Sequence, residues 1–477
     1  MRKHLLLPVV LVAVLALVGC SEDRGLAPTE SGDVSSILDP QAIAVELATE
    51  TGWPIQDDQY AGPVGSCVTP IDCEDLGGGI VHYNYRLRTG EGPYDEIGLH
   101  RVVREARPGR PIRTRKAVFL QHGDAVAFEG VFLFGSRSPN VPDDHSIAYY
   151  LASNDVDVWG IDQNWTLVPQ AETDFSFMAD WGMQNQIENL DLAMSVARFV
   201  RLMTNSGPGK MHLLGYSSGS WTGYAYLNME TQKKEHDRNV LGYIPLEAAY
   251  KGDDPTAQAT ICYFSQIYQG MHDGGQYQDM VLFSTIGYLA MTDPDGDSPL
   301  APGYSNRLVA LLYGSATHLF APFTPWYHYL AGAFDPATGM PTGFQFVTEQ
   351  AWLDFLMTSA SWEPTLFYAD YLGISCGTPD SPFDDYLGQV SVPIFNVGVG
   401  GALGPLSEYT LSLIGSTDVT SLIVSFYPPE YAAADFGHID ALIADNAEGL
   451  VWQPILAWIE DHTPRNYGQE IAGKDDF

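Results

Sequence analysis

The sequence predicts an α/β fold in which helices cover both faces of a mostly parallel sheet. Short apolar strands alternate with helix-like segments between residues 78 and 250. After a long interruption, strands return at residues 392–397 and 420–426. Alternation favours parallel pairing, because a chain that returns to the same end of a sheet needs a crossover, and that crossover is commonly a helix.

The first half of the chain contains most of the predicted strands. Residues 79–88 alternate between apolar and polar side chains as a strand does. Residues 116–121 form a compact apolar strand that ends at His122. Similar segments predict further strands at residues 98–104, 156–161, 210–215 and 240–246.

Helices are predicted between these strands from the spacing of apolar residues. Residues 180–203 show it most clearly, since Ile187, Leu190 and Met194 fall on one side of a helix. Further helices are predicted at residues 146–154, 218–229 and 450–461.

Residues 252–388 interrupt the pattern with several helix-like stretches and many aromatic residues. An insertion of about 135 residues between two strands is long even for a functional loop, so we expect it to form a domain of its own. It divides the sheet domain into residues 61–251 and 389–463, and residues 464–477 form a C-terminal tail.

The N-terminus has the pattern of an export signal. Basic residues precede an apolar run from Leu5 to Val18, which is too short to span a membrane as a helix. The run ends in Gly19-Cys20, which resembles a bacterial lipobox. This resemblance implies that residues 1–19 are a lipoprotein signal peptide and that Cys20 is lipidated. It also implies a place in the bacterial cell envelope, where Ser21 after the cysteine favours the outer membrane or cell surface. The polar residues 20–60 are then a flexible tether.

Composition excludes one large class of partners. The chain has 59 acidic and 23 basic residues and a formal charge of −36, so phosphate backbones repel it and nucleic-acid binding is not expected. Charged residues make up only 17% of the chain, which distinguishes it from a disordered polyelectrolyte.

Four further cysteines suit an oxidising compartment. Cys67 and Cys73 are close enough in sequence for a local disulfide, and Cys262 and Cys376 remain as a long-range pair. The alternative is that some of them are free buried thiols. No Cys/His cluster in the sequence suggests a zinc site.

The pattern G-x-S-x-G occurs twice and predicts a nucleophilic serine. This motif places a serine on a strained turn between a strand and a helix, with small residues on both sides so that the backbone can pass. Ser217 in Gly215-Tyr-Ser-Ser-Gly219 has an apolar strand before it and a helix-like segment after it. Ser375 is followed by Thr-Pro-Asp-Ser-Pro, so the context favours Ser217.

The order of these elements resembles the α/β-hydrolase fold over residues 75–250 and 388–462. Three segments, Phe119–Gly123, Asp157–Gly160 and Gly437–Asp440, are similar to stretches of the acid lipase family. The resemblance implies a mainly helical cap domain at residues 252–388, placed over the serine, and an ester substrate.

The resemblance also assigns the base and the oxyanion hole. His438 follows the last predicted strand, in the position of the base in this fold, and the order of nucleophile, acid and histidine agrees with it. The oxyanion hole would consist of the backbone N–H groups of Ser218 and Asp124. Asp124 is unusual there, since a carboxylate beside an oxyanion is unfavourable unless it is protonated or points away.

The acid is not at the family's usual position. That position falls at Gly400 or Gly401, and neither residue can orient an imidazole. Glu247 ends the strand that follows the nucleophile helix. In this position it resembles the catalytic Glu of some haloalkane dehalogenases. We therefore expect Glu247 to be the acid, with Asp253, Asp254 and Asp435 as alternatives.

These features predict a secreted, membrane-anchored serine hydrolase that cleaves carboxylic esters and needs no metal or other cofactor. Its substrate would be a small ester, with an apolar or aryl group favoured by the aromatic insertion. A peptidase or amidase with the same triad is one alternative. A catalytically inactive binding lipoprotein is another, because the usual Asp is missing and Asp124 is unusual.

Overall fold

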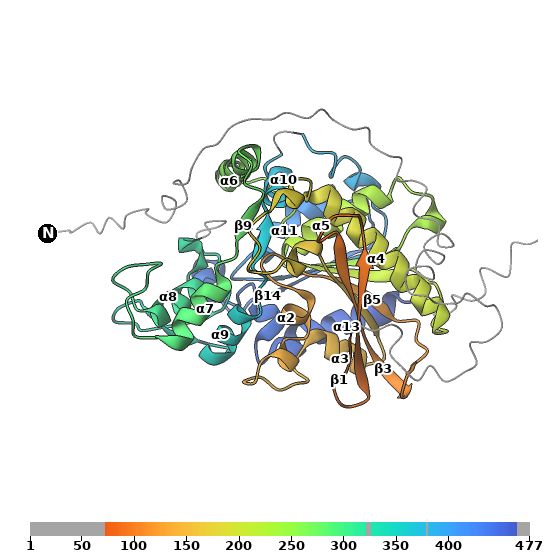
Figure 1. The fold of residues 1–477 in the computed structure, drawn as a ribbon, viewed down its shortest axis with the longest axis horizontal. Coiled ribbons are helices and arrows are strands. Elements are labelled where there is room, and N and C mark those ends of the chain that lie inside the picture. The colour runs from red at the N-terminus through yellow and green to blue at the C-terminus, as the bar shows by residue number, and fades with distance from the viewer. Residues whose placement is uncertain (1–71, 321–325, 378–379, 465–477) are drawn as a thin grey trace, which may run out of the picture.

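The computed structural model describes residues 72–320, 326–377 and 380–464, and a ten-stranded sheet forms its centre (Figure 1). The main strand order is β1-β2-β3-β6-β5-β7-β8-β13-β14, and β4 pairs with β3. The strands are β1 (Asp72–Asp75), β2 (Ile80–Arg88), β3 (Glu96–Arg107), β4 (Arg110–Pro111), β5 (Ala117–Gln121), β6 (Asp157–Asp162), β7 (Met211–Tyr216), β8 (Val240–Leu246), β13 (Ile394–Val399) and β14 (Val419–Val424).

Pairing in the sheet changes from antiparallel to parallel along its width. Strands β1 to β3 pair antiparallel, as do β3 and β6, whereas every pair from β6 to β14 is parallel. Every residue of β5, β6, β7 and β13 is buried, as expected for strands covered on both faces. The predicted fold class, a mostly parallel sheet flanked by helices, is confirmed.

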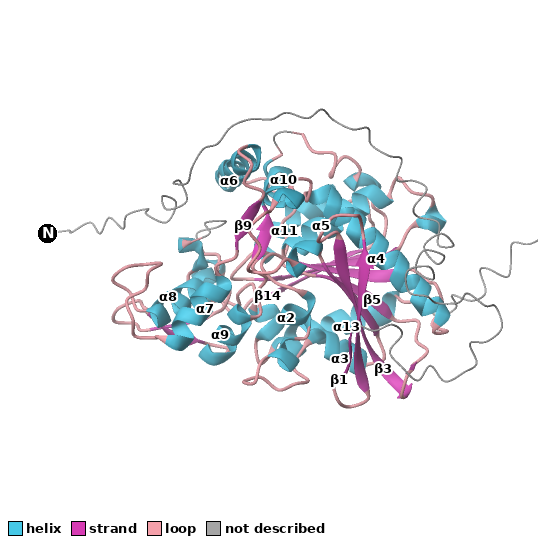
Figure 2. Ribbon diagram, viewed as in Figure 1, coloured by secondary structure: helices cyan, strands magenta, loops and turns pink. Residues whose placement is uncertain are grey.

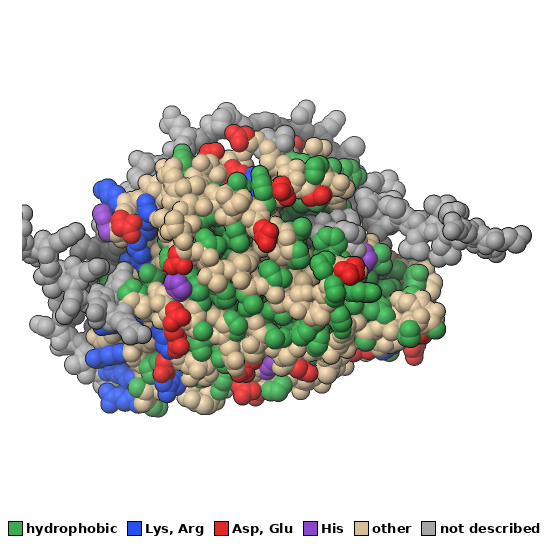
Figure 3. Space-filling view, turned by 180° about the vertical axis from the view of Figure 1, so that it is seen from behind, with side chains coloured by type: hydrophobic (Ala, Val, Ile, Leu, Met, Phe, Trp, Pro, Cys, Tyr) green, Lys and Arg blue, Asp and Glu red, His purple; other side chains and the backbone are tan. Residues whose placement is uncertain are grey.

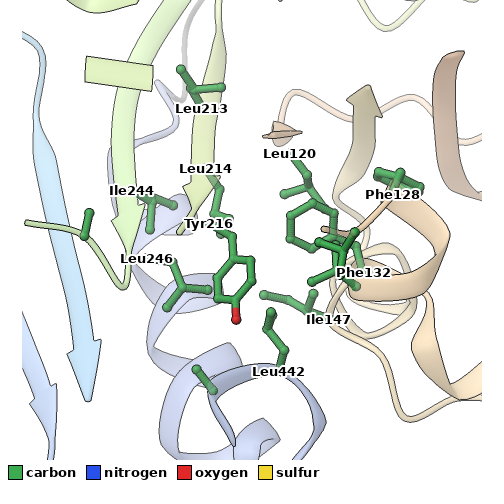
Figure 4. Close-up of a cluster of buried hydrophobic side chains, with 14 of the residues drawn as sticks. Leu120, Phe128, Phe132, Ile147, Leu213, Leu214, Tyr216, Ile244, Leu246 and Leu442 are labelled. Atoms are coloured by element: carbon green, nitrogen blue, oxygen red, sulfur yellow. The ribbon is translucent and has the colours of Figure 1, made fainter. Parts of the chain in front are cut away.

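Helices lie on both faces of the sheet (Figure 2). Around the sheet they are α2 (Phe128–Phe132), α3 (Ile147–Ser153), α4 (Met183–Met203), α5 (Ser218–Glu230), α11 (Ser407–Leu413), α12 (Asp440–Ile443) and α13 (Gln453–His462). Figure 4 shows the part of the core that lies below the site. Leu214 and Tyr216 of β7 lie beside Ile244 and Leu246 of β8, and Phe132 of α2 and Leu442 of α12 belong to the same cluster. The residue that follows Tyr216 is Ser217, so the nucleophile candidate stands on a rigid core.

The inserted segment, residues 252–388, lies between β8 and β13 in the chain. It consists of α6 (Pro255–Asp273), β9 (Gln278–Met280), α7 (Phe283–Thr292), α8 (Asn306–Ser315), β10 (Gly332–Phe334), β11 (Pro341–Phe344), α9 (Glu349–Met357), β12 (Trp362–Pro364) and α10 (Thr365–Cys376). Its buried residues Phe283, Trp352 and Phe367 belong to the same hydrophobic cluster as the sheet residues. Sheet and inserted segment therefore share one core.

The disulfide predicted between Cys262 and Cys376 is confirmed. It joins α6 to the C-terminal end of α10, with the two Cα atoms 4.9 Å apart. Several predictions concern residues outside the described part of the chain. These are the signal peptide, the lipidated Cys20, the tether, and the Cys67–Cys73 bridge, of which Cys67 is not described. Among the described residues, no helix is both long and apolar enough to cross a membrane.

Candidate active site

Ser217 stands on a sharp turn between β7 and α5. Its backbone has φ +53° and ψ −131°, a left-handed conformation that is strained for any residue with a Cβ. The two glycines of the motif make the turn possible. A Cβ on Gly215 would lie 2.5 Å from the Gly219 carbonyl oxygen, and a Cβ on Gly219 would overlap the His122 carbonyl oxygen. The motif therefore folds as the strand–turn–helix that the sequence predicts.

His438 and Glu247 meet beside this turn. The His438 Nδ1 lies 2.9 Å from Glu247 Oε2, and both side chains are buried. The imidazole also stacks on Tyr216, the residue before Ser217, with 5.0 Å between ring centres. The structure thus brings together three residues that are far apart in the chain and that the sequence predicts as a triad.

Glu247 is held firmly from the neighbouring strand. Its Oε1 accepts a hydrogen bond from the Val399 N–H at 2.6 Å, and its Oε2 accepts one from the Leu403 N–H at 3.1 Å. The backbone of Glu247 has φ +60°, and its N–H group donates a hydrogen bond to the Val397 carbonyl at 2.8 Å. Together with His438, three N–H groups converge on one carboxylate, which fixes the face that it offers to the imidazole.

The usual acid position has no room for a side chain. A Cβ on Gly400 would overlap the carboxylate of Asp435, and a Cβ on Gly401 would overlap the ring of His328. Asp435 is occupied by its own loop, because its Oδ1 accepts from the N–H groups of Phe426 and Phe436, both at 2.8 Å.

Neither of the other two alternatives for the acid is bonded to the imidazole. Asp254 caps the N-terminus of α6 by accepting from the Thr256 and Ala257 N–H groups, and Asp253 is exposed. Within the described residues, Glu247 is the only carboxylate bonded to the His438 ring.

The segment after β5 approaches the serine from the other side. A Cβ on Gly123 would lie 2.7 Å from the Ser217 Cβ, so only glycine allows this approach. The His122 Nε2 accepts from the Gln163 N–H at 3.1 Å, so its Nδ1 carries the proton and donates to the Gly123 carbonyl at 2.9 Å. Burial lowers the pKa of His122, in keeping with a neutral ring that shapes the loop.

Asp124 directs its carboxyl group into a cavity beside Ser217. Burial raises the pKa of this carboxyl, while the Ser218 hydroxyl and the His438 imidazole oppose the rise. The Tyr371 hydroxyl donates to Oδ2 at 3.4 Å, a weak bond. No Lys or Arg of the described residues forms an ion pair with Asp124. Burial thus makes this carboxyl harder to ionise than a carboxyl in water.

The cavity has a volume of about 420 Å³ and lies between the sheet, α6, α10 and the segment that leads into α11. Apolar and aromatic side chains form much of its wall: Trp221, Ile261, Tyr327, Tyr371, Leu372, Leu403 and Leu406. Four carboxyl groups also line it, those of Asp124, Asp253, Asp254 and Glu408, and none of its described lining residues is basic. The site can therefore hold a small molecule with apolar parts and without negative charge.

Ser375, the second motif serine, lies in α10 rather than on a turn. Its hydroxyl accepts from the Trp221 indole N–H at 2.8 Å and donates to the Tyr250 carbonyl at 2.9 Å. The structure thus assigns it a place in the wall of the cavity, and no base lies beside it among the described residues.

One cluster of side chains that could bind a metal ion was not predicted from the sequence. His82 and His100, on β2 and β3, lie near Glu129 of α2. The two rings are hydrogen-bonded to each other at 2.9 Å, His100 Nε2 lies 3.0 Å from Asp162 Oδ2, and Glu129 pairs with Arg137 at 2.8 Å. Burial lowers the pKa of His82 to about 3, with His100 and Arg137 adding to the effect. The contacts among these side chains link β2 and β3 to α2 and β6.

The fold has clear counterparts among solved structures. A candidate lipase from Sulfolobus solfataricus has a TM-score of 0.55 and 19% identity, over 80% of this chain and 95% of that one. A monoglyceride lipase from Saccharomyces cerevisiae has a TM-score of 0.46 and 12% identity, over 85% and 99% of the two chains. No family model and no curated protein matches the sequence. Strand order, parallel pairing and the first of these similarities lead to one conclusion: this chain has the α/β-hydrolase fold.

Proposed function

We propose that this protein is a serine hydrolase that cleaves carboxylic esters through an acyl-enzyme on Ser217. One observation carries the proposal: the His438 Nδ1 lies 2.9 Å from a buried Glu247 carboxylate, next to a serine on a strained turn. This arrangement combines a nucleophile, a base and a group that orients the base. The lipase-like fold agrees with it.

In this mechanism His438 Nε2 takes the proton from the Ser217 hydroxyl as the oxygen attacks the ester carbonyl. The Ser218 and Asp124 N–H groups stabilise the oxyanion of the tetrahedral intermediate. His438 then gives the proton to the leaving alcohol, and the acyl-enzyme remains. Water, activated by the same imidazole, releases the acid and restores Ser217. Glu247 keeps the Nδ1–H directed toward itself, so Nε2 is free to accept the proton.

The cavity suggests the kind of ester. Its volume of about 420 Å³ suits a small or medium-sized substrate, and its aromatic wall suits an apolar or aryl group. The three exposed carboxylates of the described cavity wall, those of Asp253, Asp254 and Glu408, disfavour anionic esters, because no basic residue among the described lining residues offsets them. We therefore propose neutral or cationic esters as the substrate class, and no metal or other cofactor is needed for their cleavage.

Two experiments test the function. A fluorophosphonate probe should label the protein, and peptide mapping should place the label on Ser217. Ser217→Ala should lose both labelling and esterase activity, whereas Ser375→Ala should keep the label on Ser217. Ester and anilide substrates with the same acyl group would separate an esterase from an amidase. A folded protein without labelling would favour the inactive binding protein instead.

We also propose that the protein is anchored in the bacterial cell envelope by a lipid on Cys20, with residues 20–60 as a tether. The lipobox-like sequence at Gly19-Cys20 supports this. Cys20→Ala should then move the protein from the detergent phase into the aqueous phase. Equal partitioning of both forms would contradict a lipid anchor.

A further inference from the structure

We propose that Glu363, in the inserted segment, is a positioning residue for the oxyanion hole. The geometry suggests that its carboxyl group holds the loop of residues 123–126 in the one conformation that presents the Asp124 N–H to the substrate. The inference rests on the proposed function, since it assigns the Asp124 N–H to the oxyanion hole. It adds that the inserted segment takes part in building the catalytic geometry as well as the cavity.

The loop adopts a conformation that it would not favour alone. Ala125 has φ +62°, in the left-handed region that residues with a Cβ avoid. Ala125 is buried and is not a glycine, so surrounding contacts must stabilise this conformation. The source of those contacts therefore decides where the neighbouring Asp124 N–H points.

The contacts come from a single stretch of the inserted segment. The Ala125 N–H donates to Glu363 Oε1 at 2.7 Å, and the Ala125 carbonyl accepts from the Ala360 N–H at 2.9 Å. Val126 forms an isolated antiparallel bridge with Ser359. Both polar groups of the strained residue are thus satisfied by residues that are more than two hundred positions away in the chain.

Asp124 lies between two anchored peptide groups. On one side the Gly123 carbonyl is bonded to the His122 ring, which belongs to the sheet domain. On the other side the Ala125 N–H is bonded to Glu363, which belongs to β12. With both neighbours fixed, the Asp124 backbone has little freedom to rotate. Preorganised donors of this kind are effective because they need no rearrangement during the reaction.

The Glu363 side chain is built into the protein. It is 2% exposed, and its Oε2 accepts a hydrogen bond from the Tyr368 hydroxyl. No Lys, Arg or His of the described residues forms an ion pair with it. Burial, with Asp124 nearby, raises the pKa of Glu363 well above its usual range. The contact with the Ala125 N–H needs an acceptor oxygen, which a carboxyl group supplies with or without a negative charge.

This distinction defines the test. Glu363→Ala and Glu363→Met remove the acceptor, and Met also retains most of the volume. Glu363→Gln keeps an amide oxygen for the Ala125 N–H without a charge. With a neutral ester, we expect the first two variants to lower kcat roughly 10- to 100-fold with KM within about threefold of the wild type, because they disturb a donor used in the transition state. The Gln variant should stay within about threefold of the wild-type kcat.

A boronic acid inhibitor adds a direct readout, since its tetrahedral adduct with Ser217 occupies the oxyanion hole. Its affinity should fall by the same factor as kcat in Glu363→Ala and Glu363→Met. The matched control is Glu349→Ala, which removes a glutamate of the same inserted segment whose partner is the exposed Arg307. This variant should leave kcat and inhibitor affinity unchanged. Thermal unfolding checks that each variant is folded.

Hydrogen exchange of residues 123–126 tests the contact without reference to activity. Exchange should be faster in Glu363→Ala and Glu363→Met than in the wild type, and close to wild type in Glu363→Gln. Wild-type kcat in the folded Ala or Met variant, or equal loss in Ala, Met and Gln, would overturn the inference. Absence of esterase activity in the wild type would overturn the proposed function instead, and the exchange experiment would still decide whether Glu363 holds the loop.

Discussion

At the scale of single residues, the most unusual feature of the site is the strand that precedes Glu247, the carboxylate bonded to His438. Glu247 follows β8, the neighbour of the nucleophile strand β7, whereas the fold family usually places the acid after the strand that is β13 here. Glu247 reaches the same imidazole nitrogen by crossing the end of β13, where the Val399 and Leu403 N–H groups bind it. Either strand can therefore bring a carboxylate to this imidazole, because both strands end at the same edge of the sheet.

Glu247→Gln should keep the fold but lower kcat for a neutral ester by roughly 10³- to 10⁴-fold. The amide oxygen can still accept from Val399, but the amide N–H₂ then faces His438 Nδ1 and favours the tautomer that has its proton on Nε2. That tautomer cannot take the proton from Ser217. Burst kinetics with a chromogenic ester measure the acylation step. Asp435→Asn is the matched control, since this carboxylate lies in the adjacent loop without contacting the imidazole.

The usual acid position should not rescue this variant. In Glu247→Gln/Gly400→Asp, the new side chain would overlap Asp435, so activity should stay at the level of the single variant and the melting temperature should fall. Recovery of kcat to within about tenfold of the wild type would show that the loop can adapt, and would count against a unique role for Glu247.

Asp124 should impose an alkaline limit on activity. Burial raises the pKa of its carboxyl, so the group is neutral at low pH and becomes negative as the pH rises through that value. The new charge would lie close to the developing oxyanion and would oppose it. We therefore expect kcat/KM for a neutral ester to decrease on the alkaline side in the wild type and to stay level in Asp124→Asn. Identical alkaline profiles would assign the decrease to another group.

At the scale of elements, a buried group of three charged residues joins β3, β6 and α4. Asp157 accepts from Arg101 at 2.8 and 2.9 Å and from Arg201 at 2.5 Å, and all three side chains are buried. Burial alone would raise the pKa of Asp157, but the two guanidinium groups hold it below its usual range. The contact fixes the place where the antiparallel and parallel parts of the sheet meet.

Asp157→Asn should lower the free energy of unfolding by about 3–5 kcal/mol, because it leaves two buried guanidinium groups without a counter-charge. Urea unfolding followed by tryptophan fluorescence measures the change. The control is Glu349→Gln, which breaks the exposed pair with Arg307 and should cost at most about 1 kcal/mol. Similar losses in both variants would mean that Asp157 contributes no more than a surface charge.

The elements also show how far the sequence alone can predict this fold. Strands and helices with strong local periodicity were predicted within a few residues: residues 240–246 coincide with β8, and 180–203 contain α4. Glu247 was predicted as the acid because the usual position holds glycine and because some haloalkane dehalogenases place a catalytic Glu at the end of the corresponding strand. The short strands β9 and β12 and the contact of Glu363 with Ala125 were missed. These depend on pairing between distant segments, and nothing in the local sequence of either partner indicates it.

At the scale of the whole molecule, acidic residues are abundant, and they lie both on the surface and in the interior. The chain has a formal charge of −36, and on the face shown in Figure 3 acidic side chains are spread widely while Lys and Arg gather toward one edge. Several carboxyl groups, by contrast, are withdrawn from solvent. Burial raises the pKa of Asp440 to about 7 and that of Asp370 to about 6, and it also raises those of Asp124 and Glu363.

These buried carboxyls should make the protein most stable at mildly acidic pH. A carboxyl with a raised pKa binds a proton more tightly in the folded state than in the unfolded state. Its contribution is fully present below the unfolded value near pH 4 and is lost as the pH rises through the folded value, here about 6 for Asp370 and about 7 for Asp440. The net negative charge also grows over this range as histidines lose their protons, and the added repulsion contributes to the loss. The melting temperature should therefore fall between pH 5 and pH 8, by on the order of 5 °C.

Two measurements separate the buried groups from the overall charge. Added salt should recover only the part of the loss at pH 8 that comes from surface repulsion, because buried groups are screened little. Asp370→Asn should reduce the slope of melting temperature against pH near pH 6, since it removes one group that must ionise in the folded state. The exposed Asp461→Asn changes the net charge by the same amount and should leave that slope unchanged. Equal effects of the two substitutions, or a melting temperature that rises from pH 5 to pH 8, would contradict this account, because burial of the carboxyl would then make no difference.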